Sequence, residues 1–269
     1  MSKFHDPVYL TSDQYKDAGN LNARIQLHES FSTNSYGWFR WVFDQFDLSP
    51  SAYILEVGCG SGRLWSENQN RIPHGWRVLL SDFSFGMVNG CHAGLADKHV
   101  HYSFLVSNVM AIPFLRASFD AVIADHMLYH VPDRPRALSE IARVLKPEGI
   151  FYAATNGENH LLELDELIKN YVPEDSLWTG KPSQGFCLEN GAIQLNPWFS
   201  KIERRDYQDS LVVTEAGPLL VYIHSMLPRW RIQTGTVEES TLEKAVQELI
   251  QEEGCMRIQK SSGIFMGRK

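Results

Sequence analysis

The sequence contains no long hydrophobic segment. No run of about 18 apolar residues occurs, although 43% of its 269 residues are hydrophobic, so no transmembrane helix is predicted. The first residues, MSKFHDPVYLTSDQYK, also lack the order of basic and then apolar residues that marks a secretory signal. We therefore expect a cytoplasmic protein with no membrane partner, whose hydrophobic residues form a substantial core.

Paired cysteines and an excess of positive charge are also missing. The four cysteines (Cys59, Cys91, Cys187 and Cys255) are scattered and form no C-x-x-C pair, so we predict reduced thiols and no metal site. The formal net charge of −7 offers no long-range attraction to polyanions. Because basic residues are interspersed with acidic ones, nucleic acid is not expected as a partner.

Short apolar runs rich in β-formers alternate with helical patterns in the first part of the chain. The runs lie at residues 52–57, 76–80, 100–106, 119–124 and 150–155. The clearest helical pattern, at residues 134–145, has five apolar side chains at three- and four-residue spacing and is followed by Pro147 and Gly149. This alternation predicts an α/β fold with a parallel, doubly wound sheet.

The second part of the chain departs from this rhythm. Its patterns predict helices near residues 160–171, 188–195, 217–226 and 237–253, strands near 199–207 and 211–214, and a loop or lid at 172–186. Residues 255–258 and 263–267 are expected to pair as a hairpin at the edge of the sheet. We predict one domain in three segments: a helical arm or lid at 1–50, a cofactor-binding core at 51–157, and a substrate cover that also completes the sheet at 158–269.

A glycine-rich loop follows the first predicted strand in ILEVGCGSGRLW, residues 54–65. Gly58, Gly60 and Gly62 allow a sharp turn and a close approach of the backbone to a ligand. The third glycine comes one residue too early for the G-x-G-x-x-G loop of dinucleotide enzymes. Glu56 would also place a carboxylate near a bound pyrophosphate. The loop therefore suits a cationic cofactor that carries an amino acid better than it suits NAD.

Four further motifs follow in order: LLSDFS at 79–84, SNVMAIPF at 107–114, SFDAVIADHMLYHVPD at 118–133 and ARVLKPEGIF at 142–151. With the glycine loop, they resemble the class I S-adenosylmethionine-dependent methyltransferase superfamily, in the small-molecule branch that includes ubiquinone/menaquinone-type enzymes. The resemblance is strong over residues 52–157 and weaker elsewhere. It implies a Rossmann-like, mostly parallel sheet of seven strands, with an N-terminal helical arm and a helical insertion after the fifth strand. The implied cofactor is S-adenosyl-L-methionine, with S-adenosyl-L-homocysteine as the product.

The resemblance also implies roles for individual residues. Asp82 accepts hydrogen bonds from the ribose hydroxyls, with a turn or helix cap as its alternative role. Asn108, where relatives carry aspartate, accepts from the adenine amino group or caps a turn. Arg24 pairs with the methionine carboxylate or forms a surface salt bridge. The predicted cofactor residues are Tyr15, Arg24, Glu56, Gly58, Cys59, Gly60, Gly62, Asp82, Phe83, Met87, Asn108, Val109, Met110 and Asp125.

The acceptor implied by the resemblance is a small, aromatic or heterocyclic molecule methylated at O, N or C. His126 and Tyr129 follow the fourth strand and are candidates for substrate contact or general base. His126 and His130 have the spacing of zinc-binding helices, but the glutamate of H-E-x-x-H is missing and no third ligand is evident. The predicted substrate residues are Tyr9, Tyr36, His126, Trp178, Phe186 and Tyr222, although aromatic residues more often belong to a core.

Two other function classes stay open at this point. One is a nicotinamide-dependent oxidoreductase, which the glycine spacing disfavours. The other is a catalytically silent relative that binds the cofactor as a structural or regulatory module. We expect a monomer or a homodimer.

Overall fold

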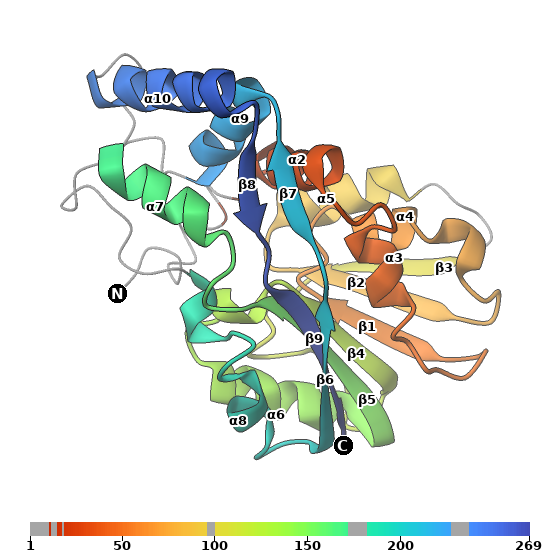
Figure 1. The fold of residues 1–269 in the computed structure, drawn as a ribbon. Coiled ribbons are helices and arrows are strands. Elements are labelled where there is room, and N and C mark those ends of the chain that lie inside the picture. The colour runs from red at the N-terminus through yellow and green to blue at the C-terminus, as the bar shows by residue number, and fades with distance from the viewer. Residues whose placement is uncertain (1–10, 12–14, 18, 96–99, 172–181, 227–236) are drawn as a thin grey trace.

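A seven-stranded sheet forms the centre of the computed structural model, which describes residues 11, 15–17, 19–95, 100–171, 182–226 and 237–269 (Figure 1). The strand order is β3-β2-β1-β4-β5-β9-β6. Strands β1 to β5 are parallel, and β9 runs antiparallel between β5 and β6. The predicted doubly wound, mostly parallel sheet of seven strands is confirmed. The strands are β1 (Tyr53–Val57), β2 (Arg77–Asp82), β3 (His101–Val106), β4 (Phe119–Asp125), β5 (Leu145–Asn156), β6 (Ser200–Tyr207) and β9 (Ser262–Arg268).

The order of the strands reverses at strand β1. It pairs with β2 on one side and with β4 on the other, so the chain winds outward from it in both directions. The loops after these strands therefore diverge at their carboxyl ends, which is where open α/β sheets leave a ligand crevice. The glycine loop follows β1 at this position.

Helices cover both faces of the sheet because alternate strand residues face opposite sides. Ile54 packs on one face with α3 (Trp38–Phe43), α4 (Arg63–Ser66) and α5 (Phe85–Gly94). Leu55 packs on the other face with α6 (Arg134–Val144) and α8 (Gly191–Leu195). Helix α6 has the predicted apolar face, and Asp133 caps it by accepting from the backbone N–H of Arg136. Short 3-10 helices lie at Gln69–Arg71, Leu128–His130 and Pro182–Gly185.

A third hydrophobic cluster stands beyond one end of the sheet. A two-stranded sheet, β7 and β8, packs there with four helices, as the upper part of Figure 1 shows. The elements are α2 (Gly19–Phe31), α7 (Leu162–Tyr171), β7 (Ser210–Val213), α9 (Ala216–Met226), α10 (Val237–Glu253) and β8 (Met256–Gln259). The N-terminal arm and the insertion therefore share one core.

The predicted hairpin of the last two strands is wrong. Strand β8 pairs with β7, where Val213 lies opposite Met256, and not with β9. Strand β9 lies inside the main sheet, where Tyr152 of β5 pairs with Met266. The physical reason is burial, because Ile264 and Phe265 are apolar side chains on opposite faces and an inner strand covers both.

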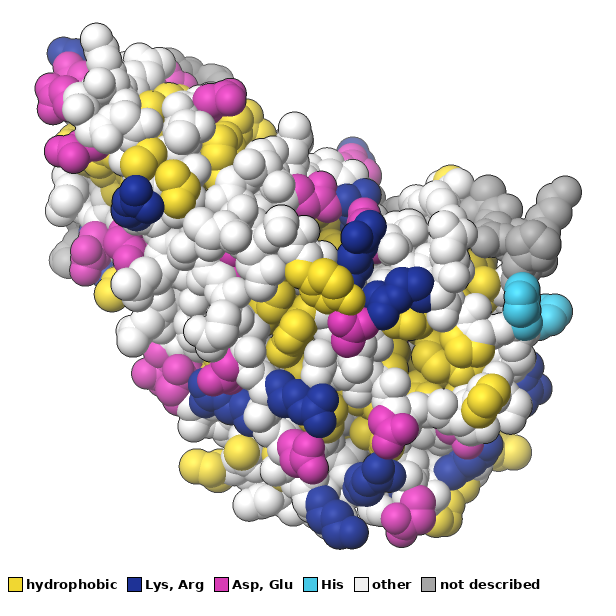
Figure 2. All heavy atoms as spheres, turned by 45° about the vertical axis from the view of Figure 1, so that its right-hand side comes forward, with side chains coloured by type: hydrophobic (Ala, Val, Ile, Leu, Met, Phe, Trp, Pro, Cys, Tyr) yellow, Lys and Arg dark blue, Asp and Glu magenta, His cyan; other side chains and the backbone are white. Residues whose placement is uncertain are grey.

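The face of the molecule drawn in Figure 2 carries mixed charge. On the face shown in Figure 2, Lys and Arg side chains lie among Asp and Glu side chains, without a broad area of one sign. Across the described part of the chain, none of the helices has the length and apolar character needed to cross a bilayer.

Candidate functional site

A cavity of about 900 Å³ opens at the carboxyl ends of the parallel strands. The glycine loop and the residues after β2, β3 and β4 form one part of its wall. Residues of α2, of the turn before α3 and of the segments around Tyr207 and Lys260 form the other part. Segments from both ends of the chain therefore enclose the crevice that the strand order creates.

The three glycines of the loop adopt left-handed backbone conformations, with φ of +71°, +53° and +76° for Gly58, Gly60 and Gly62. A Cβ on Gly58 would lie 2.7 Å from Met127, and one on Gly62 would lie 2.6 Å from the sulfur of Cys91. The loop therefore needs glycine both for its turn and for packing against the protein. Gly62 is the N-cap residue of α4 and is not part of the cavity wall, unlike Gly58 and Gly60.

Asp82, the last residue of β2, holds the glycine loop and the start of α5 together. Its Oδ2 atom accepts from the backbone N–H of Gly60 at 3.0 Å, and its Oδ1 atom accepts from the N–H of Ser84 at 2.8 Å. Ser84 caps α5 by accepting from the N–H of Met87 and donates its hydroxyl to the carbonyl oxygen of Tyr15. Burial raises the pKa of Asp82. The carboxylate thus fulfils the predicted alternative role in a turn and also lines the cavity.

The residues after β3 form a turn on the cavity wall. The side-chain carbonyl of Asn108 accepts from the backbone N–H of Met110 at 2.9 Å, which is the turn-capping arrangement. Asn108, Val109 and Met110 all line the cavity. Phe83, whose exposed fraction is 46%, stands on the wall nearby as a large apolar surface in contact with solvent.

Two carboxyl groups stand at the carboxyl ends of the neighbouring strands β1 and β4. Glu56 is 2% exposed, accepts from the indole N–H of Trp65 at 2.5 Å, and has its pKa raised to about 8, chiefly by burial. Asp125 ends β4, and burial raises its pKa to about 7. Its buried Oδ1 atom has no hydrogen-bond partner among the described residues. Both groups are therefore poised to gain charge when a cation binds beside them.

Tyr15 and Arg24, from the N-terminal part of the chain, also line the cavity. The Tyr15 hydroxyl and the Nε2 atom of His130 share a hydrogen bond of 2.9 Å. The guanidinium of Arg24 lies 5.5 Å from the centre of the Tyr15 ring, and its Nε donates to the carbonyl oxygen of Asn20. Within the described ranges, the buried Nη2 atom of Arg24 has no hydrogen-bond partner, so this cation can receive an anionic group.

The cavity continues into an aromatic chamber beyond β4. His126 has a left-handed φ of +52°, and its ring packs against Trp38 at a centroid distance of 5.0 Å. Burial, with the charge of Lys260, lowers the pKa of His126 to about 4, so the imidazole is neutral near pH 7. Burial raises the pKa of Tyr129 well above its usual range. Tyr222 lines the chamber, and Tyr36 lies on its wall while donating its hydroxyl to Asp44.

Two predicted substrate residues are outside the described residues, and one is corrected. Tyr9 and Trp178 lie in the segments 1–10 and 172–181, which the structure does not describe. Phe186 does not line the cavity, because it is 0% exposed and packs edge-on against Phe265 in the core under the sheet. Phe186 is therefore a core residue, which is the alternative role expected for aromatic residues.

Sequence reasoning missed several residues that line the chamber. The missed residues include His28, Trp38, Tyr207, Asp209 and Lys260. A signal existed for His28, because it lies four residues after Arg24 and so on the same face of α2. The turn that contains Lys260 carries no comparable signal.

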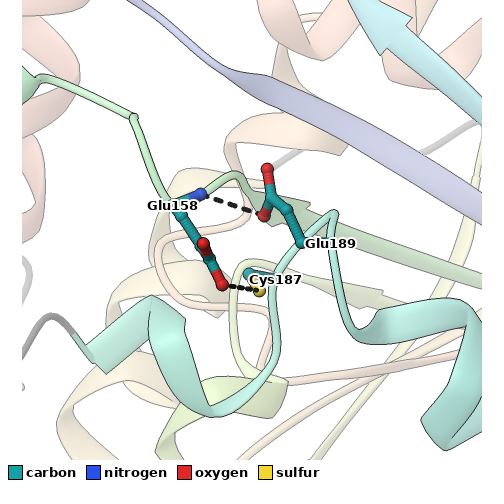
Figure 3. A group of neighbouring side chains, drawn as sticks. All are labelled: Glu158, Cys187 and Glu189. Carbon is teal, nitrogen blue, oxygen red and sulfur yellow. Dashed lines mark hydrogen bonds between the residues drawn. The ribbon is translucent and has the colours of Figure 1, made fainter.

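One group of potential metal ligands occurs outside the cavity in the described part of the chain (Figure 3). Glu158, Cys187 and Glu189 lie together, and Glu189 accepts from the backbone N–H of Glu158 while the thiol of Cys187 donates to the Glu158 carboxylate. Burial raises the pKa of Cys187, which keeps the sulfur protonated and a poor metal ligand. The group joins two distant segments of the chain by hydrogen bonds.

The sheet order, the glycine loop and the acidic residue at the end of β2 define a Rossmann-like protein that binds a nucleotide cofactor. Comparison with known families gives the next step, because residues 55–153 match the model of the family described as "Methyltransferase domain". Over these residues the chain is similar to a methyltransferase domain, and the similarity supports the small-molecule branch of the class I S-adenosylmethionine-dependent methyltransferase superfamily, with S-adenosylmethionine as the cofactor.

Individual relatives are consistent with this assignment. The O-methyltransferase resE of Aspergillus sclerotiorum is 39% identical over 110 residues, which are 40% of this chain and 41% of that protein. The ubiquinone/menaquinone biosynthesis C-methyltransferase UbiE of Vibrio cholerae is 29% identical over 67% of this chain and 69% of that protein. The chain spans about half the length of the first curated relatives that it matches, from 41% to 58%.

The fold is also found among solved structures. A phosphoethanolamine N-methyltransferase 2 of Haemonchus contortus, solved with S-adenosyl-L-methionine, is 18% identical with a TM-score of 0.59. The match covers 100% of this chain and 60% of that chain. At this level of identity, the likeness extends to the fold alone.

Proposed function

We propose that the protein transfers a methyl group from S-adenosylmethionine to O, N or C of a small aromatic or heterocyclic molecule. The observation that carries the proposal is the continuity of the cavity, which joins the loops after β1, β2 and β3 to an aromatic chamber beyond β4. A methyl donor and a flat acceptor bound in one space meet without water between them, which is what a displacement at carbon requires.

The cofactor half of the cavity offers groups of suitable charge. Arg24 has a buried N–H donor without a partner in the described residues, which suits the carboxylate of the methionine portion. Asp125 likewise has a buried oxygen without a hydrogen-bond partner in the described residues. Together with Glu56, it suits the ammonium group of the methionine portion. A cationic amino-acid cofactor thus matches both orphaned atoms, whereas a pyrophosphate would be repelled by the two carboxyl groups.

The adenosine portion is assigned to the outer loops. Asp82 keeps free lone pairs beyond its two backbone hydrogen bonds, and these can accept from the ribose hydroxyls. Phe83 and Met87 provide apolar surface for the adenine, whose edge faces the turn at 108–110. The cofactor supplies an already activated methyl group when bound, so the protein needs chiefly to orient and desolvate the acceptor.

His126 and Tyr129 are assigned to the acceptor. The neutral imidazole of His126 can donate or accept one hydrogen bond, and Trp38 fixes its ring. The raised pKa of Tyr129 favours its protonated form, so Tyr129 is a hydrogen-bond donor and not a base. The related O-methyltransferase and quinone C-methyltransferase support a small acceptor but not the atom that is methylated.

The test separates this function from its two alternatives. Labelled S-adenosylmethionine and NADH are each equilibrated with the protein by dialysis, and label transfer is then measured with phenols, catechols, amines and heterocycles. We expect retention of S-adenosylmethionine and transfer to at least one acceptor. Retention of NADH alone would indicate an oxidoreductase, and cofactor retention without any transfer would indicate a catalytically silent relative.

A further inference from the structure

A buried ion pair lies on the wall of the chamber, and neither of its members is among the residues assigned to the cofactor. Lys260 stands in the turn between β8 and β9, its side chain is 7% exposed, and its ammonium donates to Asp209, whose side chain is 0% exposed. The Lys260 Nζ atom also lies 5.6 Å from the centre of the Tyr207 ring. Both members of the pair line the cavity.

Asp209 is satisfied by several other donors. It accepts from the hydroxyl of Ser32 at 2.7 Å and from the backbone N–H groups of Asn34 at 3.0 Å and Ser210 at 2.8 Å. Its negative charge is therefore shared among these groups and is only partly available to the ammonium. A lysine has three N–H donors, and among the described residues Asp209 is the sole hydrogen-bond acceptor of Lys260.

Neutral imidazoles and flat aromatic rings surround this ammonium. His28 and His126 each have a buried Nδ1 atom without a hydrogen-bond partner in the described part of the chain. Burial, followed by the charge of Lys260, lowers the pKa of His28 to about 3 and that of His126 to about 4. Trp38 connects His126 to Tyr207 through ring contacts of 5.0 and 5.4 Å. The chamber thus offers flat walls, a buried ammonium and two weakly basic hydrogen-bonding groups.

We propose that Lys260 binds the ionised hydroxyl of the acceptor, which is therefore a phenol or an enol on a flat ring. The inference rests on the proposed function and names the substrate class of the same cavity. The hydroxyl proton passes to solvent as the acceptor binds, and the ammonium balances the remaining negative charge. Imidazoles with so low a pKa cannot hold that proton near neutral pH. The group that favours ionisation is the Lys260 ammonium, whose pKa is lowered by burial and raised by Asp209.

The number of donors favours a single oxygen. A carboxylate or a phosphate presents two or more charged oxygens and calls for a larger set of donors than the two that Lys260 retains. Of the other cations that line the cavity, Arg24 stands over Tyr15, Arg63 pairs with Glu29, and Arg40 is exposed. An acceptor with one anionic oxygen and an aromatic face matches the ammonium and the flat walls of the chamber.

The test measures ionisation directly with 4-nitrophenol and 4-nitrocatechol, whose anions absorb visible light. Each dye is titrated with pH in the presence of the full protein and S-adenosylhomocysteine. We expect an apparent pKa at least about one unit below that of the free dye. In Lys260→Met, we expect this shift to disappear, and Lys260→Arg should restore part of it. Lys244→Met, at an exposed lysine of α10, is the matched control and should keep the full shift.

A second variant guards against misfolding, because Lys260→Met leaves Asp209 buried without its cation. The double variant Lys260→Met with Asp209→Asn removes both charges and should also lose the shift. The proposal is overturned if the wild-type protein binds neither dye, if bound dye keeps its free pKa, if the neutral double variant keeps the shift, or if matched nitrobenzoates bind more tightly than the phenols. Cofactor retention by dialysis on the same samples shows whether the proposed function itself has failed.

Discussion

Replacement of Asp82 by alanine tests the link between the glycine loop and cofactor binding. In the structure, the carboxylate accepts from the backbone N–H groups of Gly60 and Ser84 at 3.0 and 2.8 Å. The substitution removes both of these acceptors together with the proposed ribose contacts. It therefore loosens the loop and also removes one direct ligand.

The expected loss of S-adenosylhomocysteine affinity is about 1.5–3 kcal/mol, the range for hydrogen bonds to a charged group. This corresponds to a Kd roughly 10- to 150-fold higher. The fold should persist. Burial raises the pKa of Asp82, so the ionised carboxylate is less favourable in the folded chain than in the unfolded one. Its removal offsets part of the cost of leaving two N–H groups without an acceptor.

Isothermal titration calorimetry gives the affinity, and urea unfolding gives the stability of the same samples. Asp82→Asn is the matched control, because it keeps the size and one carbonyl oxygen but not the charge, and it should fall between the wild type and alanine. An alanine variant that binds within twofold of the wild type would refute the assignment of Asp82 as a cofactor ligand.

Three further predictions address the loop, the buried carboxyl groups and the core. Gly60→Val should abolish cofactor binding, because φ is +53° and a Cβ would lie 2.9 Å from a neighbouring leucine methyl. Gly90→Ala, on open helix surface, should bind normally, and dialysis compares the two. Affinity for S-adenosylhomocysteine should rise from pH 6 to 8.5 with proton release, because an ammonium favours ionisation of Glu56 and Asp125, whose pKa values are about 8 and 7. Calorimetry in two buffers measures the number of protons released on binding. Equal proton release with 5′-methylthioadenosine, which lacks the ammonium, would contradict the role of the two carboxyl groups. Phe186→Ala should lower the free energy of unfolding by about 3–5 kcal/mol without changing acceptor binding. Urea unfolding and dye titration measure the two quantities, and a variant of unchanged stability with weaker dye binding would contradict this.

The cofactor half of the cavity was predictable because its groups lie at fixed spacings within short strand-loop units. Gly58, Gly60 and Asp82 follow the ends of two neighbouring parallel strands, and such ends always meet at one edge of a sheet. The three-glycine pattern also specifies a backbone conformation, which the positive φ values bear out. Local sequence is sufficient wherever chemistry and backbone geometry depend on nearby residues.

The acceptor half depends on contacts between distant segments, which a single sequence does not reveal. The alternation in residues 262–268 fits an edge strand as well as the inner position that β9 takes beside β5. Lys260 stands in a polar turn, QKSSG, of the kind that is usually exposed, and it is buried only because Asp209 stands opposite it. Phe186 shows the converse error, since an aromatic residue in a loop-like segment packs into the core.

Lys260 follows all of the residues assigned to the donor in the sequence, which has a consequence for the order in which the molecule is made. The ribosome releases the glycine loop, Asp82 and the turn at 108–110 long before it releases residue 260. A nascent chain thus carries every residue assigned to the donor while the wall that recognises the acceptor is still being synthesised. During translation, the acceptor chamber is the last part of the cavity to be completed.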